Sequence, residues 1–362
     1  KTERRSKRKV SIVDKVKIGF VGVGGMGQCA HLRNYAVLPE CEVVAIAEVK
    51  QEQGRRVAEK YGVKKVYNSH TEMLENEELD AIVASQPYSR HGVLLPDLYQ
   101  SGKPLFTEKP LGRSVEIGEA LLKVLPSGGS WHMVGYHKRS DPAAMFAKAE
   151  IERLKETKEL GALKYVRVLM PAGDWVASGF AELIGIDEPV PPMEWDAPAS
   201  DMDEKTYQEY DAFVNFYIHQ VNLMRHLLGE PYKPVYADPG GVLMAVQSDS
   251  GVTGTIEMSP YTTSVEWQES ALVAFEHGYV YLTLPAPMAM NRPGKVEIMK
   301  DPGSGVTPIR LSPDLPWVHA MRQQAINFIK AVRGEMKPMC EAAEALEDLK
   351  VAREYIRLKY GK

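Results

Sequence analysis

The chain has 362 residues, enough for about two domains. Its 44% hydrophobic and 25% charged residues exclude a disordered chain and leave enough apolar material for a sizeable core. The 44 basic and 48 acidic residues give a net charge of −4, which argues against nucleic acid or an anionic membrane as a partner. No uncharged run reaches the length of a membrane span, about 18 apolar residues, so we expect no membrane segment.

Residues 1–14 are expected to form a basic, flexible tail. Arg4-Arg5 could begin a twin-arginine export signal, but no apolar stretch follows. The three cysteines are an odd, scattered set that fits neither a disulfide framework nor a CxxC metal site. These features indicate a reducing, cytoplasmic compartment. No spacing of ligating side chains supports a metal site, and we expect none.

From residue 15 to residue 137, short apolar runs alternate with helical stretches. The expected strands are 16–21, 43–47, 81–84, 105–107 and 131–134, and the expected helices are 26–37, 51–61, 92–100 and 115–125. Alternation at this spacing predicts an α/β domain with a parallel sheet and helices on both faces.

Residues 138–362 have a different pattern, in which strands pair locally as hairpins. Asp141 and Pro142 are expected to cap and open a helix that ends near residue 159. The elements expected after it are a strand over 163–170, an acidic Pro-rich segment over 171–211, a helix over 212–228, hairpins over 242–258 and 266–284, and helices over 319–332 and 341–360. This order predicts an α+β domain on a mostly antiparallel sheet.

The turn after the first expected strand matches G-x-G-x-x-G and opens the first helix. The first glycine allows the tight turn, the second lets the backbone approach a pyrophosphate, and the third lets the helix pack closely. The helix N-terminus then offers free N–H groups to the phosphates. A glycine-rich turn without a ligand is the alternative, but the strand and helix around it favour a Rossmann dinucleotide site. The residues expected to bind the cofactor here are Gly22, Gly24, Gly25, Met26 and Gly27.

Glu48 ends the second expected strand, 21 residues after Gly27. A carboxylate there can accept hydrogen bonds from a ribose 2′-hydroxyl and would repel a 2′-phosphate. This favours NAD over NADP, although Lys50, Arg55 and Arg56 lie close enough in the sequence to weaken the preference. We include Lys50 among the expected cofactor contacts.

Several further motifs follow the glycine turn in order. They are Gln86-Pro87 with His91, Glu108-Lys109-Pro110, Gly135-Tyr136-His137-Lys138-Arg139, and His219 ten residues before Gly229. With these motifs the chain, from residue 16 to its end, resembles the glucose–fructose oxidoreductase, inositol dehydrogenase and rhizopine-catabolism (Gfo/Idh/MocA) family. Glu-Lys-Pro at the end of the fifth strand is the most specific of them.

The resemblance implies an NAD(P)-dependent oxidoreductase of sugars or cyclitols, with an open sheet in the second domain that often joins subunits into a dimer or tetramer. It implies a cis Lys109–Pro110 bond. The cofactor contacts implied outside the glycine turn are Gln86, Pro87, His91, Glu108 and Lys109. The implied substrate contacts are Lys109, Tyr136, Lys138, Arg139, Asn215 and His219.

Lys109 and His219 are the expected catalytic residues, with Asn215 beside them. Lys109 ends a strand of the parallel sheet, where α/β proteins bind their ligands, and a buried lysine can serve as a base or orient a hydroxyl. Asn215, His219 and Asn222 share one face of a helix, and histidine titrates nearest neutral pH. A surface lysine and a structural histidine are the simpler alternatives. The family usually has Asp at the two Asn positions and Asn at Tyr88, which places an Asp-assisted proton relay in doubt.

Aromatic residues accompany the acidic segment. Trp175, Trp195, Tyr207 and Tyr210 could stack on sugar rings, or could merely anchor a solvated loop; Trp175 is taken as a substrate contact. We therefore expect an NAD-dependent oxidoreductase of a sugar, sugar derivative or cyclitol hydroxyl. The alternatives are an NAD-dependent glycosidase that works by transient oxidation and elimination, and a non-catalytic nucleotide sensor.

Overall fold

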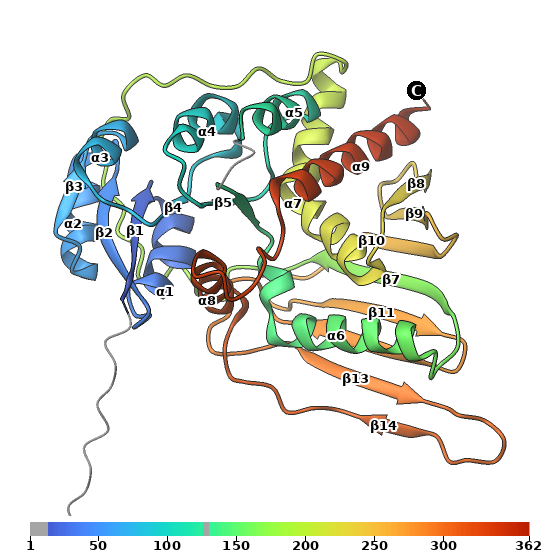
Figure 1. Ribbon diagram of the computed structural model, residues 1–362. Coiled ribbons are helices and arrows are strands. Elements are labelled where there is room, and N and C mark those ends of the chain that lie inside the picture. Colours follow the sequence, from blue (N-terminus) through green and yellow to red (C-terminus); the bar gives the residue numbers. More distant parts are fainter. Residues whose placement is uncertain (1–13, 126–129, 362) are drawn as a thin grey trace, which may run out of the picture.

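The computed structural model describes residues 14–125 and 130–361, which form two sheets with their helices (Figure 1). The basic tail expected at the N-terminus therefore lies, except for residue 14, outside the described residues. Among the residues described, no helix is long and apolar enough to cross a membrane. The same residues contain no group of three or more His, Cys, Asp or Glu that could hold a metal ion.

The first sheet has six parallel strands in the order β3-β2-β1-β4-β5-β6. The strands are β1 (Val16–Val21), β2 (Cys41–Ala47), β3 (Lys65–Tyr67), β4 (Ala81–Ala84), β5 (Leu105–Glu108) and β6 (His132–Gly135). The helices between them are η1 (Gly27–Leu32), α1 (Arg33–Tyr35), α2 (Gln51–Tyr61), α3 (His70–Asn76), η2 (Tyr88–Arg90), α4 (His91–Gln100) and α5 (Val115–Val124). This is the predicted Rossmann arrangement, and the strand order reverses between β1 and β4, where such sheets bind ligands.

The second sheet has eight strands in the order β14-β13-β12-β11-β7-β10-β9-β8. In chain order they are β7 (Leu163–Ala172), β8 (Tyr232–Ala237), β9 (Leu243–Ser248), β10 (Thr253–Thr262), β11 (Glu269–Phe275), β12 (Gly278–Leu284), β13 (Lys295–Lys300) and β14 (Ile309–Leu311). Only the β7–β10 pair is parallel, and the sheet does not close (Figure 1). The expectation of an open, mostly antiparallel sheet is confirmed.

The helices of the second half include one that starts earlier than expected. α6 (Pro142–Thr157) begins as predicted, with the Asp141 carboxylate accepting the Ala143 N–H. α7 spans Glu204–Leu228, eight residues more than the predicted 212–228, and Asp203 caps it. Asp203 and Glu204, two of the acidic residues of the segment 171–211, stand at its N-terminus, where they face the positive end of the helix dipole.

Helix α8 (Ala320–Val332) lies in the range expected for the second domain, yet it packs on the parallel sheet. Its buried Phe328 contacts Phe106 of β5 edge-to-face, with ring centroids 5.6 Å apart, and belongs to the same apolar core as Phe20 of β1. The chain therefore returns to the nucleotide-binding domain before α9 (Ala342–Tyr360) closes the fold.

A buried polar network ties α7 to α9 and to the short helix η3 (His137–Ser140). Arg225 donates to Asp348 at 3.0 Å, and Arg139 donates to Glu344 at 2.9 Å. Asn222 lies between the two pairs: its Oδ1 accepts from Arg139 and its Nδ2 donates to Asp348, both at 2.6 Å. An aspartate at position 222 could not donate to Asp348, which gives a physical reason for the amide at this position.

Asp348→Ala should lower the free energy of unfolding by about 3–5 kcal/mol, because it leaves the buried Arg225 guanidinium without its counter-ion. The neighbouring Glu347→Ala removes an exposed ion pair with Lys350 and should cost less than about 1 kcal/mol. Urea denaturation of both variants measures the difference. Equal midpoints for the two would contradict the role given to the network.

Candidate active site

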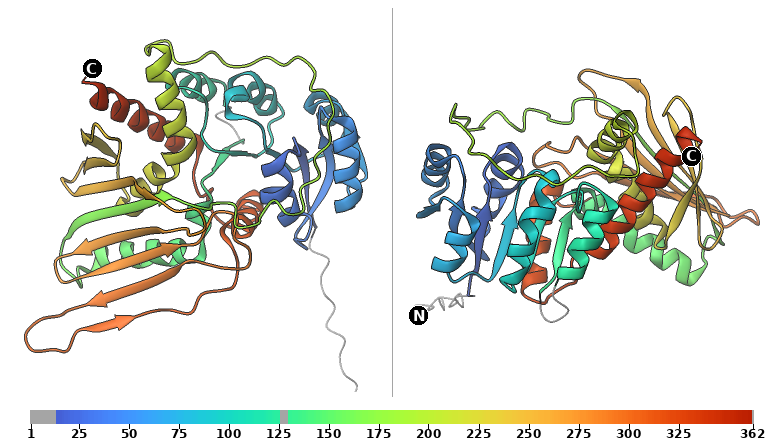
Figure 2. Two further views of the ribbon diagram at one scale, coloured as in Figure 1. Left: turned by 180° about the vertical axis from the view of Figure 1, so that it is seen from behind. Right: turned by 90° about the horizontal axis from the view of Figure 1, so that it is seen from above.

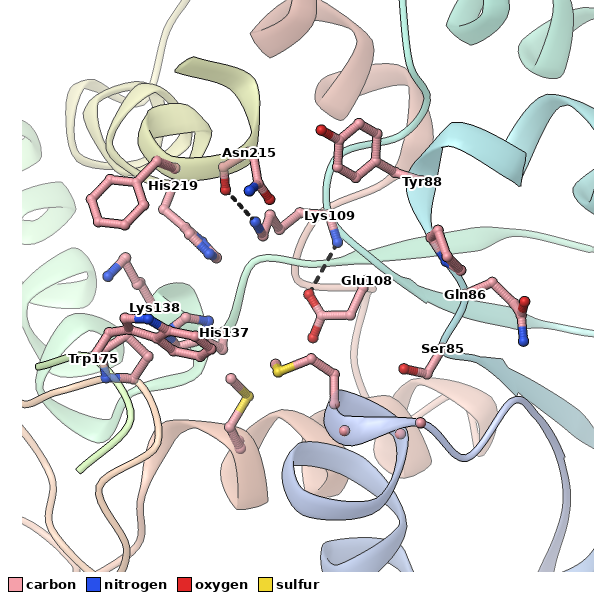
Figure 3. A pocket seen from close by; sticks show the side chains of 18 of the residues that line it. Ser85, Gln86, Tyr88, Glu108, Lys109, His137, Lys138, Trp175, Asn215 and His219 are labelled. Carbon is pink, nitrogen blue, oxygen red and sulfur yellow. Dashed lines mark hydrogen bonds between the residues drawn. The ribbon is translucent and has the colours of Figure 1, made fainter. Parts of the chain in front are cut away.

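A cavity of about 550 Å³ lies where the carboxyl edge of the parallel sheet meets the second domain (Figure 3). One wall is the glycine turn and the segments after β4 and β5. The other is made by η3, α7 and the aromatic residues Trp175, Phe216 and Trp267. Residues from both domains therefore line one space.

The glycine turn has the geometry of a phosphate cradle. Gly22 has a φ of +90°, which other residues rarely adopt, and a Cβ at Gly27 would lie 2.5 Å from the Gly22 carbonyl oxygen. Nothing lies within 4 Å of the Cβ position at Gly24, which lines the cavity. The turn is thus closed against its own helix and open toward the space where a pyrophosphate would lie.

Glu48, at the end of β2, is tied to this turn. Its buried carboxylate accepts the Val23 N–H at 2.8 Å and the Lys50 N–H at 3.0 Å. These two bonds hold the carboxylate beside the glycine turn, in the position from which an acidic residue can accept a ribose hydroxyl. The Lys50 amine is directed elsewhere and donates to the Ile186 carbonyl at 3.4 Å.

Lys109 follows β5, and its peptide bond to Pro110 is cis, as the family resemblance implied. Its Nζ donates to the backbone carbonyl of Asn215 on α7 at 2.6 Å (Figure 3). Burial lowers the pKa of Lys109 below the usual 10.5, the charge of Glu108 opposes this shift, and Lys138 adds to it.

Glu108 makes a pair with a residue that the sequence analysis did not single out. Its Oε1 lies 2.6 Å from His31 Nε2 on η1, and both side chains are buried. Burial alone would raise the pKa of Glu108, but the hydrogen bond with His31 and the charge of Lys109 bring it below its usual value. The carboxylate next to Lys109 is thus charged and already partnered.

Two histidine rings meet in the cavity. His219 of α7 and His137 of η3 lie edge-to-face, with centroids 4.7 Å apart. Burial lowers the pKa of both well below 6.5, and the nearby lysines lower them further. Both imidazoles are therefore neutral at pH 7, and a neutral imidazole can accept a proton.

Lys138 also lines the cavity, but its charge is balanced. Its Nζ lies 2.5 Å from Glu269 Oε2, and both side chains are buried. Gln220 and Trp267 donate to the same carboxylate at 2.8 and 3.2 Å. This cluster ties Lys138 and Trp267, which line the cavity, to α7 and β11.

Comparison with known proteins supports the dinucleotide site. Residues 16–136 match the family described as "Oxidoreductase family, NAD-binding Rossmann fold", GFO_IDH_MocA. Bacillus subtilis scyllo-inositol 2-dehydrogenase (NAD(+)) is 26% identical over 260 residues, 68% of this chain and 67% of the relative. Thermotoga maritima myo-inositol 2-dehydrogenase is 24% identical over 242 residues, 67% of this chain and 63% of the relative.

The chain shares the NAD-binding domain of the Gfo/Idh/MocA family.

It is accordingly an NAD-binding oxidoreductase. Solved structures share the fold of this chain over nearly its whole length. Levoglucosan dehydrogenase in complex with NADH and levoglucosan has a TM-score of 0.74 at 17% identity, covering 96% of this chain and 98% of that one. GenD2 from gentamicin A biosynthesis, in complex with NAD, has a TM-score of 0.70 at 18% identity, covering 99% and 98%.

Most of the residues expected at the site line this cavity. They are Gly24, Gly25, Met26, Gly27, Gln86, Pro87, Glu108, Lys109, Lys138, Trp175 and Asn215, together with His219. Tyr88, which departs from the family pattern, also lines it and donates to Asp211 at 3.0 Å. His137, Phe216 and Trp267 line it as well and were not expected; His137 could have been suspected because it follows β6 at the same sheet edge as Lys109.

Some expected residues are placed elsewhere. His91 is buried behind the Lys109 loop, with its Nδ1 3.1 Å from the Leu111 carbonyl oxygen, and burial lowers its pKa to about 4. Tyr136 is in the core, and Arg139 lies in the network between α7 and α9, so neither lines the cavity. Trp195 is exposed, with the guanidinium of Arg90 5.8 Å from its ring centroid.

Gly24→Val should abolish tight dinucleotide binding without unfolding the protein, because its side chain would project into the open cradle. We expect a loss of at least about tenfold in affinity, or 1.4 kcal/mol. Gly27→Val should instead lower the melting temperature, because its Cβ would meet the Gly22 carbonyl oxygen. NADH fluorescence titration and thermal melting separate the two effects. Normal NADH binding by Gly24→Val would show that the pyrophosphate does not lie there.

Proposed function

We propose that this protein is an NAD-dependent dehydrogenase for a hydroxyl group of a sugar, sugar derivative or cyclitol. The observation that carries the proposal is the bond from Lys109 Nζ to the Asn215 carbonyl, which holds an ammonium and the neutral His219 at one cavity. The curated relatives named as inositol and levoglucosan dehydrogenases support the substrate class.

The residues present fit the dinucleotide. The open cradle at Gly24 would hold the pyrophosphate, and Glu48 would accept a ribose hydroxyl. When bound, NAD supplies the nicotinamide ring that accepts a hydride from the substrate carbon. Open α/β sheets bind ligands at the strand-order reversal, and here the cavity extends from that point to Lys109 and His219.

The proton of the reacting hydroxyl is assigned to Lys109 and His219. An ammonium has three N–H donors, and the Asn215 carbonyl takes one, so Lys109 can donate to the substrate oxygen and stabilise its developing negative charge. His219, neutral in this setting, accepts the proton. The faces of Trp175, Phe216 and Trp267 provide apolar walls for a sugar or cyclitol ring.

A cytoplasmic location and a dimer or tetramer formed through the second sheet remain predictions. The sheet has open edges, and all three residues of β14 at one edge are exposed. An additional strand or a second copy of the sheet could pair there.

Lys109→Ala and His219→Ala should each reduce kcat by about 10²–10⁴-fold, the usual contribution of a positioned acid or base. NAD affinity should change little, because both side chains lie outside the glycine turn. Asn215→Ala should cost less, because the bond to Lys109 uses the backbone carbonyl of residue 215. Screening sugars and cyclitols for NADH formation identifies the substrate, and steady-state kinetics then measures the variants.

His277, exposed at the β11–β12 turn, is the matched control, and His277→Ala should retain full turnover. Turnover near the wild-type level in His219→Ala would remove that histidine from the mechanism. An active protein that releases an aglycone without NADH accumulation would point to the redox-neutral alternative.

In the pH profile of kcat/KM, both the acidic and the basic limb should lie at lower pH than the ordinary pKa values of histidine and lysine would give. The pKa of His219 is below 6.5, so the base form persists at pH 7, and activity should fall only as the pH drops through this lowered pKa. The pKa of Lys109 is below 10.5, so the charged form is lost, and activity falls, before that pH is reached. An acidic limb above pH 6.5, or one that persists unchanged in His219→Asn, would contradict the assignment.

A further inference from the structure

A segment of the second domain crosses the nucleotide-binding domain. Residues 173–203, here called the strap, leave β7, pass over the ends of the first strands and helices, and return to α7 (Figures 1 and 2). Glu182 of the strap pairs with Lys60 of α2 at 3.3 Å. The backbone of Ile184 makes two hydrogen bonds with the Gln28 side chain, each 3.0 Å long.

The strap is also held near its C-terminal end, by the first turn of α4 and the residues before it. The Asp196 carboxylate accepts the Gly92 N–H at 2.8 Å, in the first turn of α4, and the Asp196 N–H donates to the Ser89 carbonyl at 2.8 Å. Both flanks of the strap are therefore fixed by hydrogen bonds. The part between them is positioned over the end of β2, where Glu48 lies.

Between these anchors, Glu188 places a carboxylate on the N-terminus of α2. Its Oε2 accepts the Glu52 N–H at 3.1 Å and the Gln53 N–H at 3.4 Å. Free N–H groups at a helix N-terminus would otherwise attract a phosphate. Here a half-buried side chain from the second domain already occupies them.

The Glu188 and Glu48 carboxylates accept backbone N–H groups only two residues apart, at Glu52 and Lys50. Glu48 ends β2, its Oε1 accepts the Lys50 N–H, and α2 begins at the next residue. A ribose whose 2′-hydroxyl contacts Glu48 would therefore have its 2′ position near the backbone of residues 50–53. A phosphate added there would meet both Glu48 and Glu188.

The basic residues that could have favoured NADP are already engaged. Lys50 donates to the strap carbonyl of Ile186 at 3.4 Å. Arg55 and Arg56 each pair with Glu52 at 2.9 Å and are largely exposed. Each of the three basic side chains that made the sequence ambiguous thus already has a hydrogen-bond or ion-pair partner in the structure.

We propose that Glu188 is a second selectivity residue for the cofactor, contributed by the strap, and that it excludes the 2′-phosphate of NADP from the N-terminus of α2. The inference rests on the proposed use of NAD. It assigns part of the cofactor preference to the second domain, in addition to Glu48 of the nucleotide-binding domain.

The test is the dissociation constant of NADH and of NADPH, measured by fluorescence for the wild-type protein, Glu188→Gln, Glu48→Ser and the double variant. Glu188→Gln keeps an oxygen that can accept from α2 but removes the charge. The ratio of the NADPH to the NADH constant should fall about tenfold in this variant, as expected when one nearby like charge is removed. NADH affinity itself should stay within about twofold.

Glu182→Gln is the matched control, because it removes the same charge from the strap beside Lys60 instead of at the α2 N-terminus. In Glu182→Gln the ratio of the NADPH to the NADH dissociation constant should equal that of the wild type. An unchanged ratio in Glu188→Gln, or an equal change in Glu182→Gln, would overturn the proposal. Failure of the wild-type protein to bind either dinucleotide would instead overturn the proposed function.

A measurement on the wild-type protein covers the case in which Glu188→Gln does not fold. Competition of adenosine 2′-monophosphate and adenosine 5′-monophosphate against NADH is compared at low and high salt. Repulsion by a carboxylate is screened by salt, so the penalty against the 2′-phosphate should shrink as ionic strength rises. If the affinity for adenosine 2′-monophosphate instead fell further below that for adenosine 5′-monophosphate as salt increased, the site would attract the 2′-phosphate, and the proposal would be contradicted.

Discussion

The hydrogen bond from Lys109 Nζ to the Asn215 carbonyl joins the parallel sheet to the second domain. Lys109 directly follows β5, and Asn215 stands one helical turn before His219 on α7. The bond therefore brings the ammonium and the imidazole to the same cavity, although 110 residues separate them in the sequence. The proposed chemistry depends on this junction, since neither domain alone contains both groups.

The Lys109 ammonium and the His219 imidazole are left free to contact a substrate, because three other pairs of buried ionisable side chains contact each other. Lys138 is matched by Glu269, Arg225 by Asp348, and Glu108 by His31. Each pair satisfies a charge that would otherwise be costly to bury. The ammonium of Lys109, by contrast, contacts a neutral carbonyl, which leaves its charge to act on a substrate oxygen.

The features that the sequence predicted correctly are local. The glycine turn, the alternating strands and helices and the acid at the end of β2 follow from short-range patterns, and so does the placement of Lys109 at a strand end. The family resemblance added the pairing of Lys109 with His219. These expectations concern residues whose role is set by their neighbours in the chain.

The features that the sequence did not reveal depend on long-range contacts. Asn222 shares a helical face with His219 but turns into the α7–α9 network, because Arg139 and Asp348 meet there. No local sequence motif indicated a role for His31, because its partner Glu108 is 77 residues away in the sequence. The sequence left open whether the acidic segment is a solvated loop or contacts a sugar, whereas the structure shows a strap held across the nucleotide-binding domain.

The central claim is that Lys109 and His219 together handle the proton of one substrate hydroxyl. The most direct measurement is a crystal structure of the protein with NAD and the sugar or cyclitol that it oxidises. The account predicts the reacting oxygen within hydrogen-bond distance, about 2.6–3.2 Å, of both Lys109 Nζ and an imidazole nitrogen of His219. A reacting oxygen beyond the reach of both groups, or held by other side chains of the cavity, would contradict it.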